Sequence, residues 1–286
     1  MTAIAAEGAA AAAAAARLSA FDRQARIVEL VTRRGFVDID TLVRHFGVTP
    51  QTIRRDLNQL GAEGRLARYH GGAGLPSSVE NVDYAARQVL HPAEKQRIAR
   101  RAASLIPDRA SLFINIGTTT EAVASELVRH QGLRVITNNL NVATILSRRT
   151  DFEIIIAGGH VRNRDGGIVG EATVDLIDQF RVDYGIIGIS GIDMDGTMLD
   201  YDYREVRVAQ AIVRNARRVL LVADHSKFGR EAMVRMGSLT QLAAVVTDRQ
   251  PAERIRTLLA QAGVQLLIAD ETGDAASGSQ APPPLP

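Results

Sequence analysis

A run of one glycine and three threonines, Gly117-Thr118-Thr119-Thr120, follows an apolar stretch at 112–116 and opens a helix-like stretch. Backbone N–H groups, hydroxyl groups and the positive end of a helix dipole together make such a turn an anion site. A phosphate ester is the anion that this chemistry suits. A simple threonine N-cap is the plainer interpretation, and these four residues alone favour it.

Lys227 is the second residue type that indicates phosphate chemistry. The chain contains 32 Arg but only two Lys, Lys95 and Lys227. Lysine carries a compact point charge on a flexible stem, whereas the charge of arginine is spread over a planar guanidinium group. Because Lys227 lies in the loop Asp224-His225-Ser226-Lys227 after an apolar run, a phosphate contact or a salt bridge explains its presence better than a solvated surface charge does.

Polar and glycine residues follow several other apolar runs. Each loop is a weak signal alone, since the asparagines would equally cap a helix and the glycines would equally admit another backbone. Together they form a candidate set for the hydroxyl groups and phosphate of a ligand: Asn138, Asn139, Gly158, Gly159, Asp193, Asp195, Arg204 and Glu205, beside Gly117, Thr118, Thr119, Thr120 and Lys227.

An α/β domain with a mostly parallel sheet is the architecture that would bring these loops together. Short β-rich runs alternate with helix-like stretches, and ligands of such sheets bind at the carboxyl ends of the strands. A helix at 93–106 begins this domain. The runs lie at 112–116, 134–136, 153–157, 184–189, 218–223 and 244–247.

A different chemistry is indicated near the N-terminus, at 49–60. Thr49 is a good N-cap and Pro50 suits the first helical position. Ile53, Leu57 and Leu60 fall on one apolar face. The outward positions hold side chains that bond base edges and phosphates, namely Thr49, Gln51, Thr52, Arg54, Arg55 and Asn58. An ordinary amphipathic surface helix is an equally good interpretation of these residues alone.

The flanking segments favour a DNA-reading helix. A first helix at 21–34 and a second one, capped by Asp38 or Asp40 and ended by Gly47, precede it in a helix-turn-helix arrangement. The stretch 63–74 interleaves Arg68 and His70 with apolar residues before a glycine turn. We interpret it as a two-stranded wing that contacts the DNA backbone or minor groove, rather than as a glycine-rich linker.

Charge and composition agree with two domains. We expect a disordered Ala-rich extension at 1–16, a DNA-binding domain at 17–75, a linker at 76–92, a sensing domain at 93–270 and a disordered tail at 271–286. Residues 17–75 carry a balance of +4, against −1 for residues 76–286. The sequence predicts a cytoplasmic protein without a membrane span or secretory signal. It has no cysteine and no spacing of its six histidines that suggests a metal, so we expect no metal and no cofactor.

Gln51-Thr52-Ile53-Arg54-Arg55-Asp56-Leu57 and the wing His70-Gly71-Gly72-Ala73 resemble the DeoR family of winged-helix regulators, over the whole chain outside its ends. The resemblance implies a Rossmann-like α/β sensor domain similar to ribose-5-phosphate isomerase. There Gly117–Thr120 and Lys227 would grip phosphate, and Asp193, Asp195, Arg204 and Glu205 would surround the polyol. This chain has threonine at position 120, where the resemblance would lead us to expect proline.

The resemblance further implies a repressor released from operator DNA by a phosphorylated polyol or sugar, with sn-glycerol 3-phosphate favoured. A regulator for another sugar phosphate is the alternative, and a sugar-phosphate isomerase is a remote one. No enzymatic activity is expected. Since one winged helix reads a long site only with a symmetric partner, we expect a homodimer or homotetramer.

Overall fold

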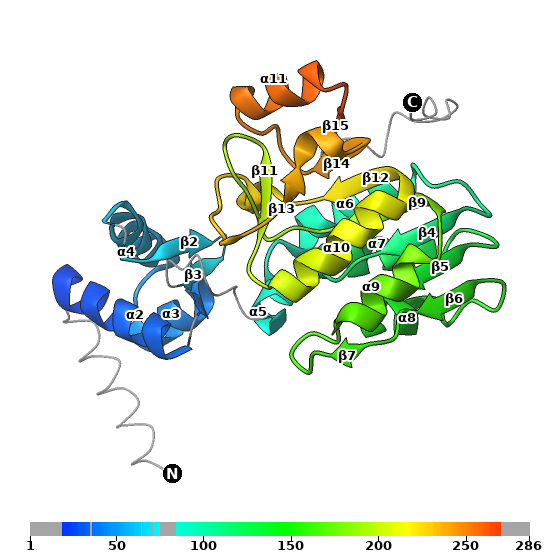
Figure 1. Ribbon diagram of the computed structural model, residues 1–286. Helices are drawn as coiled ribbons and strands as arrows, with labels where there is room; N and C mark the ends of the chain where they lie inside the picture. The colour runs from blue at the N-terminus through cyan, green and yellow to red at the C-terminus, as the bar shows by residue number, and fades with distance from the viewer. Residues whose placement is uncertain (1–18, 35, 64, 70, 75–83, 270–286) are drawn as a thin grey trace, which may run out of the picture. The chain divides into compact units, whose positions relative to one another are not determined.

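The computed structural model describes residues 19–34, 36–63, 65–69, 71–74 and 84–269, and it divides the chain into two compact units (Figure 1). The first unit comprises Met1–Ser77 and Ala85–Leu90, and the second comprises Ser78–Tyr84 and His91–Pro286. A short helix, α5 (Tyr84–Val89), occupies part of the expected linker. The expected N-terminal extension and C-terminal tail lie outside the described residues.

Three helices of the first unit form the predicted helix-turn-helix. They are α2 (Ala20–Arg34), α3 (Ile39–Phe46) and α4 (Pro50–Ala62). Asp38 caps α3, because its Oδ1 accepts a hydrogen bond of 2.7 Å from the Thr41 backbone N–H. Gly47 ends α3 at φ 63°, a left-handed conformation that glycine adopts without strain. The turn into α4 is therefore set by local chemistry.

The wing is a three-stranded antiparallel sheet rather than the two-stranded one predicted. Its strands are β1 (Phe36–Asp38), β2 (Ala67–Tyr69) and β3 (Gly72–Gly74), in the order β1-β3-β2. The third strand was missed because 36–38 reads as part of the connection between two helices. Gly72 allows the close pairing, since a Cβ there would lie 2.4 Å from the Val37 carbonyl oxygen.

A seven-stranded parallel sheet forms the centre of the second unit, in the order β15-β14-β12-β9-β4-β5-β6. The six predicted strands are confirmed. The seventh, β15, is a half-buried edge strand of four residues that the sequence pattern did not reveal. The strands are β4 (Ser111–Ile114), β5 (Arg134–Thr137), β6 (Glu153–Ile156), β9 (Val182–Ile187), β12 (Ala216–Val222), β14 (Ala244–Thr247) and β15 (Gln265–Ile268).

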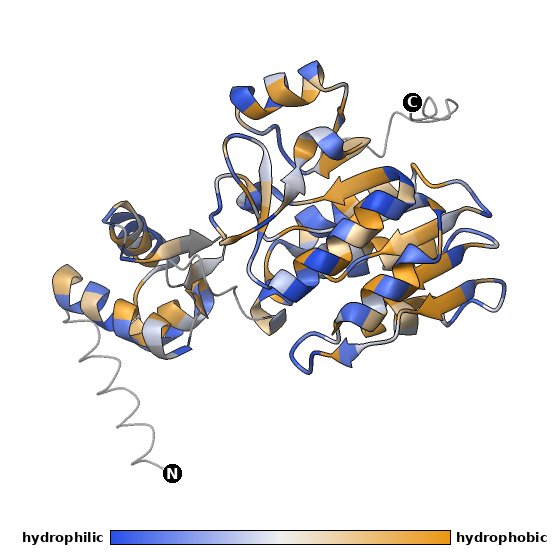
Figure 2. Cartoon of the chain, in the orientation of Figure 1, coloured by the Kyte–Doolittle hydropathy of each residue, from blue (hydrophilic) through white to orange (hydrophobic). Residues whose placement is uncertain are grey.

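Helices cover both faces of this sheet. Leu112 and Ile114 of β4 pack in one cluster with α6 (Pro92–Ala103), α7 (Thr118–Leu127) and α8 (Leu140–Leu146). Phe113 packs on the opposite face with α9 (Glu171–Asp178), α10 (Tyr203–Asn215) and α11 (Glu253–Gln261). The central strands are consequently mostly apolar, as Figure 2 shows.

Two small antiparallel sheets accompany the large one. The first contains β10 (Gly191–Ile192), β11 (Thr197–Asp200) and β13 (Val234–Ser238), and the second contains β7 (His160–Val161) and β8 (Ile168–Val169). The stretch 193–205, which contains Asp193, Asp195, Arg204 and Glu205 of the predicted ligand set, spans the β10–β11 turn, β11 and the start of α10. No helix within the described residues is long and apolar enough to cross a membrane.

Candidate functional site

Helix α4 presents the polar surface that its sequence predicts. Thr49 Oγ1 accepts a hydrogen bond of 3.2 Å from the Thr52 backbone N–H, which caps the helix. Ile53, Leu57 and Leu60 are at most 1% exposed and hold α4 against the core of the first unit. The side chains on the other face are exposed or half-exposed: Gln51, Thr52, Arg54, Arg55 and Asn58. These side chain types bind bases and phosphates.

A buried ion pair ties α4 to α2. Arg23 Nε donates to Asp56 Oδ2 at 2.5 Å, and a second guanidinium nitrogen donates to Oδ1 at 3.1 Å. Gln24 adds an amide donor at 3.3 Å, and Asp56 is 3% exposed. Sequence reasoning missed this pair. Its signal was available, since Asp56 lies on the same helical face as Ile53, Leu57 and Leu60.

The strands of the wing are described, but the side chains of its two predicted contact residues are not. The backbone of Arg68 pairs with Ala73 in the β2–β3 ladder, while the Arg68 side chain and all of His70 lie outside the described part of the structure. Their contacts with DNA therefore remain predictions.

In the second unit, the sheet has its switch point between β4 and β9. From β4 the chain continues to β5 and β6 on one side and then returns to β9 on the other. In open α/β sheets, ligands bind in the crevice outside the carboxyl ends of the strands at such a point. The loops after β4, β9 and β12 border it.

The loop after β4 begins α7. Gly117 has φ 150°, in the region that favours glycine, and Thr118 is half-exposed as the first residue of the helix. Thr120 is fully buried, and its hydroxyl donates to the carbonyl oxygens of Asn115 at 2.8 Å and Gly117 at 2.7 Å. Both hydrogen bonds of the Thr120 hydroxyl lie within the loop, and a ligand role for Thr120 stays a prediction. Thr119 is 6% exposed.

Asn138 and Asn139 follow β5 and have different roles. Asn139 is fully buried; its Oδ1 caps α8 and its Nδ2 donates to Glu121 Oε1 at 3.0 Å. Asn139 thus caps this helix, and its role in ligand binding stays a prediction. Asn138 Nδ2 donates to the Ile168 carbonyl oxygen at 3.0 Å, while its Oδ1 is buried without a hydrogen-bond partner among the described residues. Buried acceptors usually have a hydrogen-bond partner, so this oxygen is suited to accept a hydrogen bond from a ligand or from ordered water.

Glu121 is the centre of a polar network that sequence reasoning missed. Its Oε2 accepts from the Tyr84 hydroxyl at 2.7 Å, and its Oε1 accepts from Asn141 Nδ2 at 3.0 Å. The same Asn141 amide group donates to the Asp165 carbonyl oxygen at 3.1 Å. Glu121 is 9% exposed, so these hydrogen bonds satisfy a carboxylate that burial would otherwise penalise.

Arg162 connects this network to the start of α10. Its guanidinium donates to Asp165 and to Glu205, at 2.6 Å each, and to Asp202 at 3.2 Å. Burial lowers the pKa of Arg162, but Glu205 and Asp165 raise it above its usual value, so the group stays charged. Glu205 is thus held in place by Arg162. Sequence reasoning missed Arg162, whose partners lie up to 43 positions away in the sequence.

Arg204 lies at the exposed side of the same cluster. Burial raises the pKa of Asp202, but hydrogen bonds from Arg204 and the charges of Arg204 and Arg162 lower it to about 2. Arg204 Nη2 lies 3.1 Å from Asp202 Oδ2. Arg204 is exposed at the helix N-terminus and stays in the candidate ligand set.

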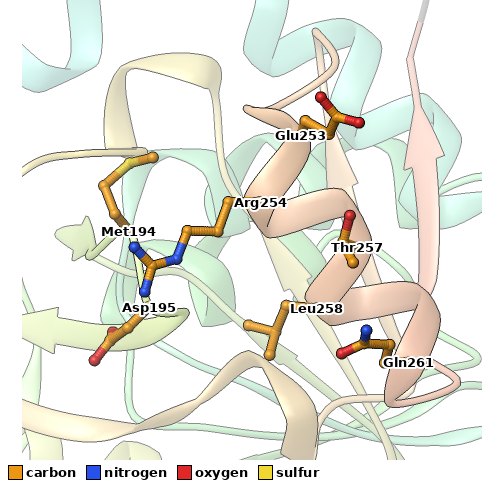
Figure 3. A pocket seen from close by; sticks show the side chains of 7 residues that line it. All are labelled: Met194, Asp195, Glu253, Arg254, Thr257, Leu258 and Gln261. Atoms are coloured by element: carbon orange, nitrogen blue, oxygen red, sulfur yellow. The ribbon is translucent and has the colours of Figure 1, made fainter.

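Four further residues of the predicted ligand set lie in two other parts of the second unit, the β10–β11 turn and the segment after β6. The Oδ1 atoms of Asp193 and Asp195 accept from the backbone N–H groups of Met194 and Thr197, which holds the β10–β11 turn. Figure 3 shows Asp195 and Met194 beside α11, around an open hollow of about 480 Å³. Gly158 and Gly159 follow the edge strand β6, where a Cβ on Gly159 would lie 2.2 Å from Thr173 Oγ1.

Lys227 ends a turn that follows β12. Asp224 caps this turn through the Ser226 backbone N–H at 2.9 Å, and Lys227 is half-buried. Burial raises the pKa of Asp224, but the charge of Lys227 and the Ser226 hydroxyl lower it to about 2. With β9 between them, β12 and β4 are about 10 Å apart, since neighbouring strands are separated by about 4.8 Å. Lys227 and Gly117–Thr119 thus border the crevice from its two sides.

Both units match known sequence families. The DeoR-like helix-turn-helix domain matches residues 23–79, and the DeoR C terminal sensor domain matches residues 90–249. The Glycerol-3-phosphate regulon repressor of Escherichia coli (strain K12) is 55% identical over 240 residues, 84% of this chain and 95% of the relative. The repressor of the same name from Haemophilus influenzae (strain ATCC 51907 / DSM 11121 / KW20 / Rd) is 52% identical over 229 residues, 80% and 89% of the two chains.

A solved structure with a similar fold is ribose 5 phosphate isomerase A from Neisseria gonorrhoeae. It has a TM-score of 0.36 and 14% sequence identity, covering 47% of this chain and 52% of that chain.

Proposed function

The chain belongs to the DeoR family of transcription regulators, and from this premise we propose that it represses genes of glycerol 3-phosphate metabolism. The effector that we propose is sn-glycerol 3-phosphate, which lowers the affinity of the repressor for its operator DNA. Support for the gene set comes from two relatives named as repressors of the glycerol-3-phosphate regulon, at 55% and 52% identity.

The proposed DNA surface is the exposed face of α4 together with the wing. Arg54 and Arg55 are exposed and project from a helix fixed on its other side by Ile53 and Leu57. Arginine reads guanine or binds phosphate, and Gln51 and Asn58 suit adenine. Arg68 and His70 of the wing are proposed phosphate or minor-groove contacts. A homodimer or homotetramer would present two such surfaces to one operator.

The proposed effector site is the crevice at the β4–β9 switch point. Backbone N–H groups at Gly117–Thr119 and the ammonium group of Lys227 would hold the phosphate. Asn138 Oδ1 would accept a hydrogen bond from a glycerol hydroxyl, and Arg204 would add donors from the edge. The observation that carries this proposal is that Lys227 and Gly117–Thr119 follow strands that β9 alone separates, so the two strands are about 10 Å apart.

Repression and release require coupling between the two units. The effector must bind the DNA-incompetent state more tightly than the DNA-bound state, because equal affinity for both states shifts no equilibrium. The coupling is reciprocal, so operator DNA must weaken effector binding by the same factor.

The test is a titration of the full chain with labelled operator DNA at several fixed concentrations of sn-glycerol 3-phosphate. We expect the Kd for DNA to rise 5- to 150-fold at saturation, the usual range of allosteric coupling. A parallel thermal shift panel would include fructose 1-phosphate and ribose 5-phosphate, since bound ligand at 100 times its Kd stabilises by about 2.7 kcal/mol. A shift with another sugar phosphate only would replace the effector assignment, and turnover of ribose 5-phosphate would contradict a purely regulatory role.

A further inference from the structure

Two histidines and an aspartate converge beside β12, although one of the histidines, His91, lies far from the other two residues in the sequence. His91 immediately precedes α6, while Asp224 and His225 follow β12. One imidazole nitrogen of each histidine and a carboxylate oxygen of Asp224 all lie within 4.8 Å of one another. The two imidazole rings meet edge to face, with centroids 4.9 Å apart. Two imidazoles and one carboxylate are a donor set that binds first-row divalent metals.

His225 is oriented as metal-binding histidines are. Its Nδ1 lies 2.7 Å from Asp248 Oδ2, and the backbone N–H of His225 donates to Asp248 Oδ1 at 2.6 Å. The Asp248 side chain is fully buried. A carboxylate on one ring nitrogen fixes the tautomer and raises the basicity of the other nitrogen, which is the arrangement of carboxylate–histidine–metal sites. The other ring nitrogen, Nε2, is then the ligand atom.

Burial and charge also suit a cation. His91 is 4% exposed and Asp224 is 1% exposed, whereas the His225 side chain is 24% exposed and leaves a way in from solvent. Glu94 lies 3.9 Å from His91 Nδ1, so three carboxylates surround the imidazoles, against the charges of Lys227 and Arg249.

We propose that His91, Asp224 and His225 form a binding site for a single first-row divalent metal ion of the Zn²⁺ type. Zn–N distances near 2.05 Å in tetrahedral geometry place ligand atoms about 3.4 Å apart, so small side-chain rotations close the site. Three protein ligands leave a fourth position for water or another oxygen ligand. The two imidazoles select Zn²⁺ over Mg²⁺, which prefers oxygen ligands. The proposal does not depend on the identity of the effector.

The test is a titration of the chelator-treated full chain with ZnCl₂ in competition with a chromogenic chelator. We expect one saturable Zn²⁺ per chain. His225→Asn removes a metal ligand at the more exposed position and should abolish the saturable binding of this Zn²⁺ ion. Asp248→Asn keeps all three ligands but releases the His225 ring, and it should weaken the affinity 10- to 100-fold, the usual cost of losing such a support.

His160→Ala is the matched control, since His160 is an exposed histidine of β7 outside the cluster, and this variant should bind Zn²⁺ as the wild type does. A thermal unfolding scan of each variant, with and without Zn²⁺, separates folding from binding: ligand binding to the native state should raise the wild-type Tm and leave that of His225→Asn unchanged. Absence of saturable binding in the wild type, or the same stoichiometry in His225→Asn, would overturn the proposal.

Discussion

Replacing Asp56 by alanine should destabilise the DNA-binding unit more than any exposed change on α4. Asp56 and Arg23 form a bidentate pair with side chains 4% and 11% exposed. Removing one partner leaves the other charge buried without compensation, which costs about 3–5 kcal/mol. At about 1.4 kcal/mol per factor of ten, the equilibrium constant for unfolding of this unit should rise by two to three and a half orders of magnitude.

Hydrogen exchange of the full chain measures this change locally, because peptides from α4 report the opening free energy of their own unit. Peptides from β4 and β9 serve as the internal reference, since both strands belong to the other unit. Arg26→Met is the matched control: Arg26 is an exposed arginine of the same helix as Arg23, and surface changes usually stay within about 0.5 kcal/mol.

The double variant Arg23→Met with Asp56→Leu distinguishes an ion pair from simple packing. Replacing both charges by apolar groups of similar volume is often neutral, so exchange protection should largely return. The reasoning would be refuted by a less than tenfold loss of protection in Asp56→Ala, or by a double variant as labile as the single one.

Arg54→Ala should weaken operator binding and reduce the slope of log K against log salt by about 1 if the side chain neutralises one phosphate; an unchanged affinity would exclude it from the interface. Lys227→Ala should bind operator DNA normally but lose release by sn-glycerol 3-phosphate in the same titration, and normal release would remove Lys227 from the effector site. The pKa of Asp202 is lowered to about 2, so its contribution to stability is present above about pH 3.8 and is lost as the pH falls towards 2. Asp202→Asn should therefore flatten the acid limb of an unfolding profile, and an unaltered limb would contradict this. Thr49→Ala should cost about 1 kcal/mol in exchange protection of α4, whereas an unchanged α4 would show that the cap hydrogen bond contributes nothing.

The sequence predicted those parts of the fold that short periodic patterns determine. The spacing of Ile53, Leu57 and Leu60 and the cap at Thr49 are local, and both are confirmed. The buried strands were predictable because both faces of a parallel sheet are apolar. The β10–β11 hairpin was also signalled, since Asp195-Gly196 between β-rich residues is a turn sequence. Its carboxylates were instead assigned to a ligand.

The side-chain networks were not predictable from spacing. Arg162 reaches Glu205 across 43 positions, and His91 reaches His225 from the opposite end of the second unit's sequence. Polar type alone also fails to show which way a side chain faces. Thr118 and Thr120 are two positions apart in one polar run, yet Thr118 is half-exposed while Thr120 bonds inward to Asn115.

The position of the switch point has a consequence for biosynthesis. All helices and strands of the DNA-binding unit end by Val89, whereas the crevice is complete only when β12 and its loop have been made, about 150 residues after the wing. At about 5–20 residues per second, a nascent chain spends roughly 7–30 s with a complete DNA-reading helix and no complete effector crevice. During that interval the crevice that we propose as the effector site does not yet exist. We therefore expect the proposed control by the effector to begin late in translation and to apply to the finished chain rather than to the reading helix from its first appearance.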